Sequence, residues 1–190
     1  MGRTRQVEPA RQRLLAAADE LFYNNGICST GVDAVVSRAR VATGSLYNNF
    51  GSKDELVAAY LEARGHRWAD VWDACVAACT DPVDRVLAIF TAMEDWSSAG
   101  TKQRGCAHVA AVVQLERGTP GMAAALAHKR IVKERLQELV AATDVADPAQ
   151  TTRDILMVYE GMFNQLAMDL DPDPIGTARR LAAGFLRPQV

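Results

Sequence analysis

A short polar segment in the first third of the chain has residue types that can make hydrogen bonds to DNA. Thr43, Gly44 and Ser45 are closely followed by Asn48 and Asn49. Hydroxyl and carboxamide groups can pair with base edges in the major groove and with phosphate oxygens. A glycine carries no side chain, so a helix that contains it can approach a duplex closely. The segment therefore predicts a surface that contacts DNA.

Two neighbouring residues could hold this segment against the DNA backbone. Tyr47 is expected to place its ring in the protein core and its hydroxyl on a phosphate. Lys53 is expected at the start of a helix, where free backbone N–H groups also favour an anion.

Three helices are needed to position the polar segment. The apolar spacing predicts helices over 9–24, 30–39 and 43–50, with a turn at 40–42. Two short helices joined by so short a turn are typical of a helix-turn-helix, in which the first helix braces the second. The same spacing also fits three core helices with a polar loop, so both interpretations stay open on periodicity alone.

The rest of the chain is also predicted to be helical. Ser52 and Glu55 form a capping box that begins a long fourth helix, which keeps its helical phase to Thr80. Five further helices are expected over 82–98, 105–116, 120–143, 148–169 and 174–186. Because no alternating strand pattern persists, the predicted fold class is all-α with nine helices.

Composition and charge limit the class of protein. The 190 residues are 49% hydrophobic and 23% charged, as in ordinary globular proteins. Residues 1–53 carry seven Lys and Arg against four Asp and Glu, whereas residues 54–190 carry fourteen against nineteen. This asymmetry favours nucleic-acid binding by the N-terminal part. No apolar run suits a membrane span or a secretory signal, so we expect a cytoplasmic protein that does not bind membranes.

The N-terminal pattern resembles the TetR family of bacterial repressors. The resemblance covers residues 9–60, and its most specific part is Leu46, Tyr47, Phe50 and Lys53. The other matching residues are Arg13 to Ala18, Leu21, Phe22, Gly26, Thr30 to Val32, the rest of Ala39 to Phe50, and the rest of Ser52 to Leu56. The resemblance implies a helix-turn-helix whose recognition helix is 43–49.

The resemblance also implies which residues contact operator DNA. The implied contact residues are Thr30, Arg40, Thr43, Gly44, Ser45, Tyr47, Asn48, Asn49 and Lys53. Tyr47, Asn49 and Lys53 would contact phosphates, and Thr43, Ser45 and Asn48 would face bases. An N-terminal arm would follow the DNA backbone or enter the minor groove, with a solvated tail as the alternative. The basic residues of this arm are Arg3, Arg5, Arg11 and Arg13.

Two departures from the family pattern affect the turn and the recognition helix. The family usually has Gly in place of Arg40 and often Ser in place of Ala42. We expect Arg40 to avoid the left-handed conformation that favours Gly, and to add a phosphate contact. The family favours His in place of Asn49, whose phosphate contact would be neutral.

By the same resemblance, the chain has two functional domains. Residues 7–67 would form the DNA-binding domain, with the helix-turn-helix at 31–50. Residues 68–190 would bind a ligand and form a dimer. The long fourth helix would join the two domains without a flexible linker.

The second domain offers aromatic and methionine side chains that suit a small apolar or aromatic ligand. The predicted pocket residues are Trp68, Trp72, Phe90, Met93, Trp96, Cys106, His108, Val112, Met162 and Phe163. The alternative is that these residues simply fill the core. No cluster of Arg or Lys indicates a strongly anionic ligand.

The helix over 148–169 is apolar on more than one face, so one face could meet a second copy of the chain. With 174–186 it would build the four-helix interface of a homodimer aligned with a palindromic operator. The predicted interface residues are Tyr159, Leu166, Ala178, Leu181, Ala182 and Phe185.

The cysteines and histidines do not indicate a metal site. Cys75 and Cys79 lie one helical turn apart, and Cys106 and His108 could add two ligands. Their spacing differs from the common zinc patterns, and all four lie in apolar stretches. Because a phosphate-binding glycine loop and a nucleophile elbow are also absent, we expect no cofactor, no metal and no enzymatic activity.

The function that combines these expectations is a ligand-responsive DNA-binding transcriptional regulator. We expect a repressor that a small apolar or aromatic effector releases from double-stranded operator DNA by changing the separation of two recognition helices. A transcriptional activator or an effector-independent regulator with the same DNA-binding site is the alternative. A purely structural helical module is a further one.

Overall fold

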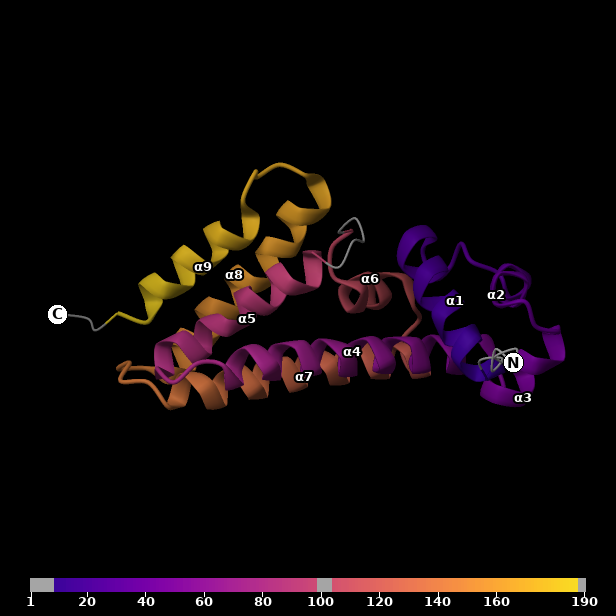
Figure 1. The fold of residues 1–190 in the computed structure, drawn as a ribbon, viewed down its shortest axis with the longest axis horizontal. Helices are drawn as coiled ribbons and strands as arrows, with labels where there is room; N and C mark the ends of the chain where they lie inside the picture. Colours follow the sequence, from indigo (N-terminus) through magenta and orange to yellow (C-terminus); the bar gives the residue numbers. More distant parts are fainter. Residues whose placement is uncertain (1–8, 99–103, 188–190) are drawn as a thin grey trace, which may run out of the picture. The chain divides into compact units, whose positions relative to one another are not determined.

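The computed structural model describes residues 9–98 and 104–187, and all regular structure in these residues is helical (Figure 1). The helices are α1 (Ala10–Asn25), α2 (Val32–Ala39), α3 (Thr43–Phe50), α4 (Lys53–Ala77), α5 (Pro82–Ser98), α6 (Ala107–Gln114), α7 (Pro120–Ala141), α8 (Pro148–Met168) and α9 (Pro174–Phe185). The all-α prediction is confirmed, and each helix ends within a turn of its predicted end. No helix of the described residues is both long and apolar enough to cross a lipid bilayer.

Side-chain caps explain where several helices begin. Asp147 accepts a hydrogen bond of 2.9 Å from the Gln150 N–H at the start of α8. At the start of α4, the Ser52 hydroxyl accepts one of 3.1 Å from the Glu55 N–H, as the capping box predicts. Each cap satisfies a backbone donor that has no partner within its own helix.

The chain forms two compact units, and each is described by itself. Unit 1 comprises residues 1–64 and 107–126, and unit 2 comprises residues 65–106 and 127–190. Helix α6 and the first turns of α7 therefore belong with the N-terminal helices. Compactness does not assign function, so the functional domains 7–67 and 68–190 stay a prediction.

The core of unit 1 joins helices that are far apart in the sequence. Phe22 of α1 meets Tyr60 of α4 edge to face, with ring centres 5.6 Å apart. His108 of α6 is buried, and its Nε2 lies 3.1 Å from the carbonyl oxygen of Leu61. The completely buried apolar residues are Leu14, Ala18, Leu46, Leu56, Leu61, Ala111 and Ala125.

The core of unit 2 is rich in aromatic rings. The Tyr159 ring lies 5.0 Å from Phe163, 6.4 Å from Phe90 and 6.3 Å from Trp68, measured between ring centres. Trp68 also meets Trp96 edge to face at 5.8 Å. Other buried members of this core are Trp72, Val76, Val86, Ile89, Met93, Leu136, Ile155 and Met162.

Candidate nucleic-acid interface

Helix α3 buries one face and exposes the other. Leu46 is completely buried and Phe50 is 9% exposed. Ser45 is half-buried. The exposed residues of this helix are Thr43, Gly44, Tyr47, Asn48 and Asn49. Because the polar residues lie on a helix and face solvent, the alternative of core helices with a polar loop does not describe this segment.

Tyr47 departs from its predicted position. The residue is 50% exposed, so the expectation that its ring lies in the core is wrong. Leu46 and Phe50 are one turn apart on the buried face, and Tyr47 is rotated by about 100° from Leu46 around the helix axis. An exposed ring with a hydroxyl remains suited to the DNA backbone.

The turn between α2 and α3 holds Arg40 in the left-handed conformation, with φ 53° and ψ 51°. The expectation that Arg40 avoids this conformation is wrong. Arg40 N–H donates to the Ser37 carbonyl and Val41 N–H donates to the Val36 carbonyl, both at 3.1 Å. This pair of bonds closes the end of α2 in the way that usually selects glycine. A residue with a side chain costs about 1–2 kcal/mol there.

Arg13 of α1 supports the same turn from within unit 1. Its Nη1 donates to the carbonyl of Ala39 at 3.2 Å and to that of Arg40 at 3.0 Å. A cation at the last carbonyls of a helix also matches the negative end of the helix dipole. Arg13 was predicted in the DNA-contacting arm, and the structure gives it the additional task of holding the turn that precedes α3.

The remaining residues of the predicted arm are only partly described. The guanidinium carbon of Arg11 lies 5.1 Å from the ring centre of Phe50, as in a cation–π contact. Arg3 and Arg5 lie outside the described residues.

Two of the predicted contact residues, Thr30 and Lys53, donate hydrogen bonds to the loop before α2. Thr30 is 3% exposed, and its hydroxyl donates to the Gly26 carbonyl at 2.8 Å. This hydroxyl fixes the loop before α2 and does not face solvent. The Lys53 ammonium donates to the Ile27 carbonyl at 2.8 Å. An ammonium has three N–H groups, so Lys53 keeps donors for a phosphate.

Gln114, the last residue of α6, fixes the same loop and was not singled out from the sequence. Its Oε1 accepts a hydrogen bond of 2.9 Å from the Ile27 N–H, and its carbonyl accepts one of 3.2 Å from Cys28 Sγ. Ile27 is therefore held at its N–H by Gln114 and at its carbonyl by Lys53. No local pattern could reveal this contact, because 87 positions separate its partners.

Eight of the ten predicted ligand-pocket residues lie together in the aromatic core of unit 2. They are Trp68, Trp72, Phe90, Met93, Trp96, Cys106, Met162 and Phe163. The indole N–H groups of Trp68 and Trp72 are buried without a hydrogen-bond partner. Such orphan donors are rare, and each costs about 1–3 kcal/mol. The other two predicted residues, His108 and Val112, belong to unit 1.

The predicted dimer residues divide by exposure. Those buried in the core of unit 2 are Tyr159, Ala178 and Ala182. Leu166 is half-buried, whereas Leu181 is 53% and Phe185 40% exposed. The buried group lies on the faces through which α5, α8 and α9 pack on one another. Only the exposed group offers apolar surface to a second copy.

Cys75 of α4 has an environment that favours its protonated thiol. Cys75 Sγ donates to Asp95 Oδ2 at 3.5 Å. Burial, and then Asp95, raise the pKa of the Cys75 thiol above its ordinary value. A protonated thiol is a poor nucleophile and a poor metal ligand. Within 9–98 and 104–187, no three His, Cys, Asp or Glu side chains gather in a way that could hold a metal ion.

These observations define the class of protein. A short helix, α2, braces a second helix, α3, across a fixed turn, and α3 turns its small and hydrogen-bonding side chains to solvent. This is the architecture of a helix-turn-helix DNA-binding protein.

Comparison with known proteins agrees with that class. The sequence model of the family described as "Bacterial regulatory proteins, tetR family" matches residues 14–60. The HTH-type transcriptional regulator LmrA of Bacillus subtilis is 33% identical over 83 residues, which are 43% of this chain and 44% of LmrA. The HTH-type transcriptional regulator UidR of Escherichia coli is 22% identical over 186 residues, 95% of this chain and 91% of UidR.

A solved structure extends the similarity to most of the chain. The TetR-family transcriptional regulator SCO4454 from Streptomyces coelicolor has a TM-score of 0.86 at 29% identity, with 94% of each chain covered. Residues 14–60 therefore match the TetR family of bacterial regulatory proteins, and the chain shares its fold with a TetR-family transcriptional regulator along most of its length.

Proposed function

We propose that this protein is a homodimeric repressor that a small apolar or aromatic effector releases from a palindromic operator. The observation that carries the proposal is the amphipathic division of α3, in which buried Leu46 anchors a helix whose polar face is open. An added Cβ at Gly44 would meet nothing within 4 Å. The helix can therefore approach a major groove closely at this point.

Specificity and affinity would come from different residues of this surface. Thr43, Ser45 and Asn48 would read base edges, whereas Tyr47 and Lys53 would contact phosphates. The other proposed DNA-contacting residues are Gly44, Asn49 and Arg40, which is exposed. The Asn49 amide donates to the Ser45 carbonyl at 2.7 Å and keeps a second N–H for DNA. We leave Thr30 out, because its hydroxyl is buried.

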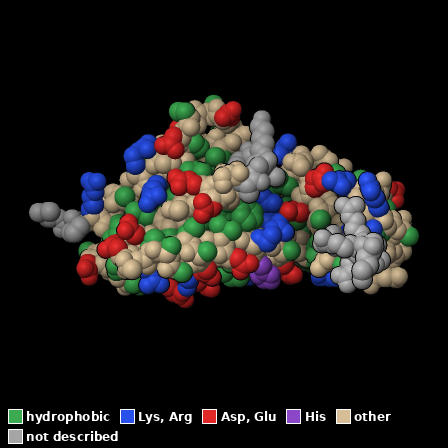
Figure 2. All heavy atoms as spheres, viewed as in Figure 1, with side chains coloured by type: hydrophobic (Ala, Val, Ile, Leu, Met, Phe, Trp, Pro, Cys, Tyr) green, Lys and Arg blue, Asp and Glu red, His purple; other side chains and the backbone are tan. Residues whose placement is uncertain are grey.

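Exposed apolar residues on α8 and α9 support the homodimer. Met157 is 76%, Leu181 53% and Phe185 40% exposed. Over α8 and α9, the face in view in Figure 2 carries hydrophobic, basic and acidic side chains interspersed, not a surface of one charge. A twofold axis through such an interface would present two copies of α3 to major grooves about 34 Å apart.

The aromatic core of unit 2 supports an apolar or aromatic effector. A ligand that enters among these rings gains contacts with Trp, Phe and Met side chains, which are the usual walls of such sites. The orphan N–H groups of Trp68 and Trp72 would favour an effector that also carries a carbonyl or ether oxygen, since an acceptor would remove their desolvation cost.

Selection of genomic DNA fragments on the purified protein tests the proposal. We expect enrichment of a palindromic site, which would then define an operator for binding measurements. Asn48→Ala should weaken operator binding by about 1–3 kcal/mol and relax the preference at one base pair. Asn24→Ala, which changes an exposed asparagine of α1, is the matched control and should bind as the unchanged protein does. Absence of any enriched palindrome would refute the proposal.

A further inference from the structure

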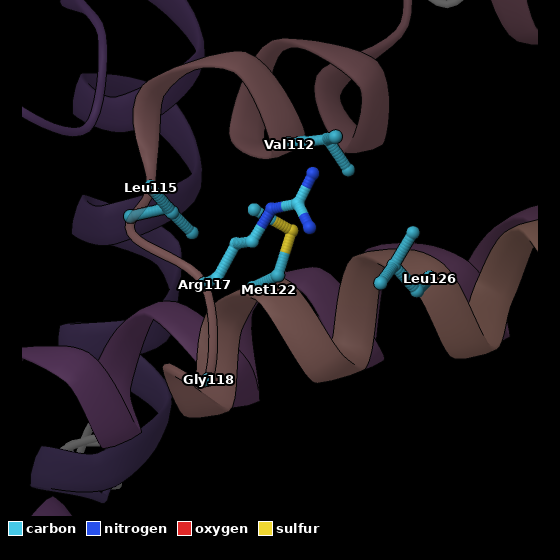
Figure 3. A pocket seen from close by; sticks show the side chains of 6 residues that line it. All are labelled: Val112, Leu115, Arg117, Gly118, Met122 and Leu126. Carbon is cyan, nitrogen blue, oxygen red and sulfur yellow. The ribbon is translucent and has the colours of Figure 1, made fainter.

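We propose that unit 1 contains a second ligand site, a groove for a small molecule with an apolar body and a single carboxylate group. The groove has a volume of about 570 Å³ and lies between α6 and the start of α7 (Figure 3). It is lined by Val112, Leu115, Arg117, Gly118, Met122 and Leu126. None of these residues belongs to the aromatic core of unit 2 proposed above as the effector site, although the sequence had placed Val112 in that pocket.

The walls of the groove suit an apolar body. Val112 and Leu115 come from α6 and the residue after it, and Met122 and Leu126 lie one turn apart on α7. Leu126 is 45% exposed, so apolar surface remains open to water. The volume lies in the range of about 300–1,000 Å³ that is usual for small-molecule sites. Filling it would remove this apolar surface from solvent.

Arg117 supplies the charge of the groove. Its side chain reaches between the apolar walls, with the guanidinium beside Met122 and directed toward Val112 in Figure 3. No hydrogen bond or ion pair holds Arg117 within the described residues, whereas Arg38 and Arg64 pair with carboxylates of unit 1. A guanidinium presents two parallel N–H donors that match the two oxygens of a carboxylate.

Two further features favour a monoanion. No acidic side chain lines the groove. Helix α7 begins at Pro120, directly after Gly118 and Thr119, so its positive end lies beside the groove lining. One guanidinium and one helix end can balance a single carboxylate, whereas a more highly charged ligand would keep uncompensated charge.

A second copy of this chain is the competing occupant. An apolar side chain from another copy could use the same walls, but it would leave the Arg117 guanidinium without a counter-ion. Burying an unpaired charge is costly, so the groove fits a ligand that brings its own carboxylate better than it fits an apolar protein surface.

Calorimetric titration of the full chain with octanoate and with 1-octanol tests the site. Octanoate should bind, and 1-octanol should bind at least roughly tenfold more weakly, because it lacks the charge. Arg117→Gln should weaken octanoate binding by roughly tenfold or more and leave 1-octanol binding unchanged. Arg85→Gln, at an exposed arginine of α5 outside the groove, is the matched control and should bind both as the unchanged protein does.

Leu126→Trp provides a second, steric variant. Leu126 is partly exposed, so the larger ring should be tolerated by the fold and should fill the groove, abolishing binding of both probes. The inference is overturned if octanoate does not bind, if 1-octanol binds equally well, or if either groove variant leaves octanoate affinity unchanged. Operator binding without added ligand is measured on the same samples. Its loss would count against the proposed function and not against the groove.

Discussion

Unit 1 pairs the polar groups around its loop 26–30 with one another, whereas unit 2 leaves polar groups unpaired inside its core. In unit 1, Thr30 bonds the Gly26 carbonyl, and Ile27 is held by Gln114 and Lys53. In unit 2 the side-chain atoms that are buried without a partner, among the described residues, are Trp68 Nε1, Trp72 Nε1, Ser97 Oγ and Arg135 Nε.

This difference matches what each unit is proposed to bind. A surface that reads a DNA duplex must hold several side chains in fixed positions, so its supporting loop gains from satisfied hydrogen bonds. In a core that admits a small molecule, unpaired N–H donors can bind an acceptor of the ligand and so raise its affinity. The same unpaired donors lower the stability of the unliganded protein. The following substitutions test this comparison, beginning with the largest expected effect.

Substitutions of two neighbouring residues of α3 should differ most in their effect on the free energy of unfolding. Leu46→Ala should lower the free energy of unfolding by about 2–5 kcal/mol, because Leu46 is completely buried. Tyr47→Ala should lower it by less than about 0.5 kcal/mol, because Tyr47 is half-exposed. Urea denaturation without DNA measures both. Equal losses would show that Tyr47 is part of the core and not of an open surface.

Removing a hydroxyl from unit 1 should lower the free energy of unfolding more than removing an indole N–H from unit 2. Thr30→Val removes a buried, paired donor and should cost about 1–3 kcal/mol of unfolding free energy. Trp72→Phe removes an unpaired donor, and this relief should offset lost packing to within about 1 kcal/mol. The same denaturation experiment compares them. A larger loss for Trp72→Phe than for Thr30→Val would contradict the difference between the units.

His128 of α7 tests through pH how burial affects a titratable group of unit 2. Burial, and then Lys129, lower the pKa of His128 from 6.5 to about 4. Between these values the unfolded chain takes up a proton that the folded chain does not. The free energy of unfolding should therefore fall by about 1–2 kcal/mol from pH 7 to pH 5 on account of this residue.

The variant His128→Gln removes this titration. Its unfolding free energy should decrease less than that of the unchanged protein over the same interval, measured by urea denaturation at the two pH values. If both proteins lose stability equally, His128 accepts a proton in the folded state as readily as in the unfolded one.

The smallest effect is expected at the turn of unit 1. Arg40→Gly should raise the free energy of unfolding by about 0.5–1 kcal/mol, because Arg40 has a positive φ of 53°. Arg38→Gly, at a helical position of α2, is the control and should lower it by about 1 kcal/mol. Thermal unfolding measures both. A loss of stability in Arg40→Gly would mean that the Arg40 side chain contributes more than its backbone conformation costs.

Local patterns predicted the helices well and the roles of single polar residues less well. The apolar residues Leu46, Tyr47 and Phe50 indicated a third helix, although only Leu46 and Phe50 are buried in it, and the Ser52–Glu55 pair indicated the start of α4. The resemblance to the TetR family placed Thr30 among the DNA contacts and Arg13 in the N-terminal arm. The structure shows that the Thr30 hydroxyl is buried, and that the Arg13 guanidinium donates to two carbonyls of the protein itself.

The amino-acid order alone determined the all-α class, the sites where helices start, and the amphipathic division of α3, because capping and the 3.6-residue repeat act over a few neighbouring positions. Three features were decided only by the tertiary structure. Gln114 accepts a hydrogen bond from the Ile27 N–H, Arg40 adopts the left-handed backbone conformation, and α6 packs with the N-terminal helices. These features depend on which distant surfaces meet, and contacts between positions so far apart leave no periodic trace in a single sequence.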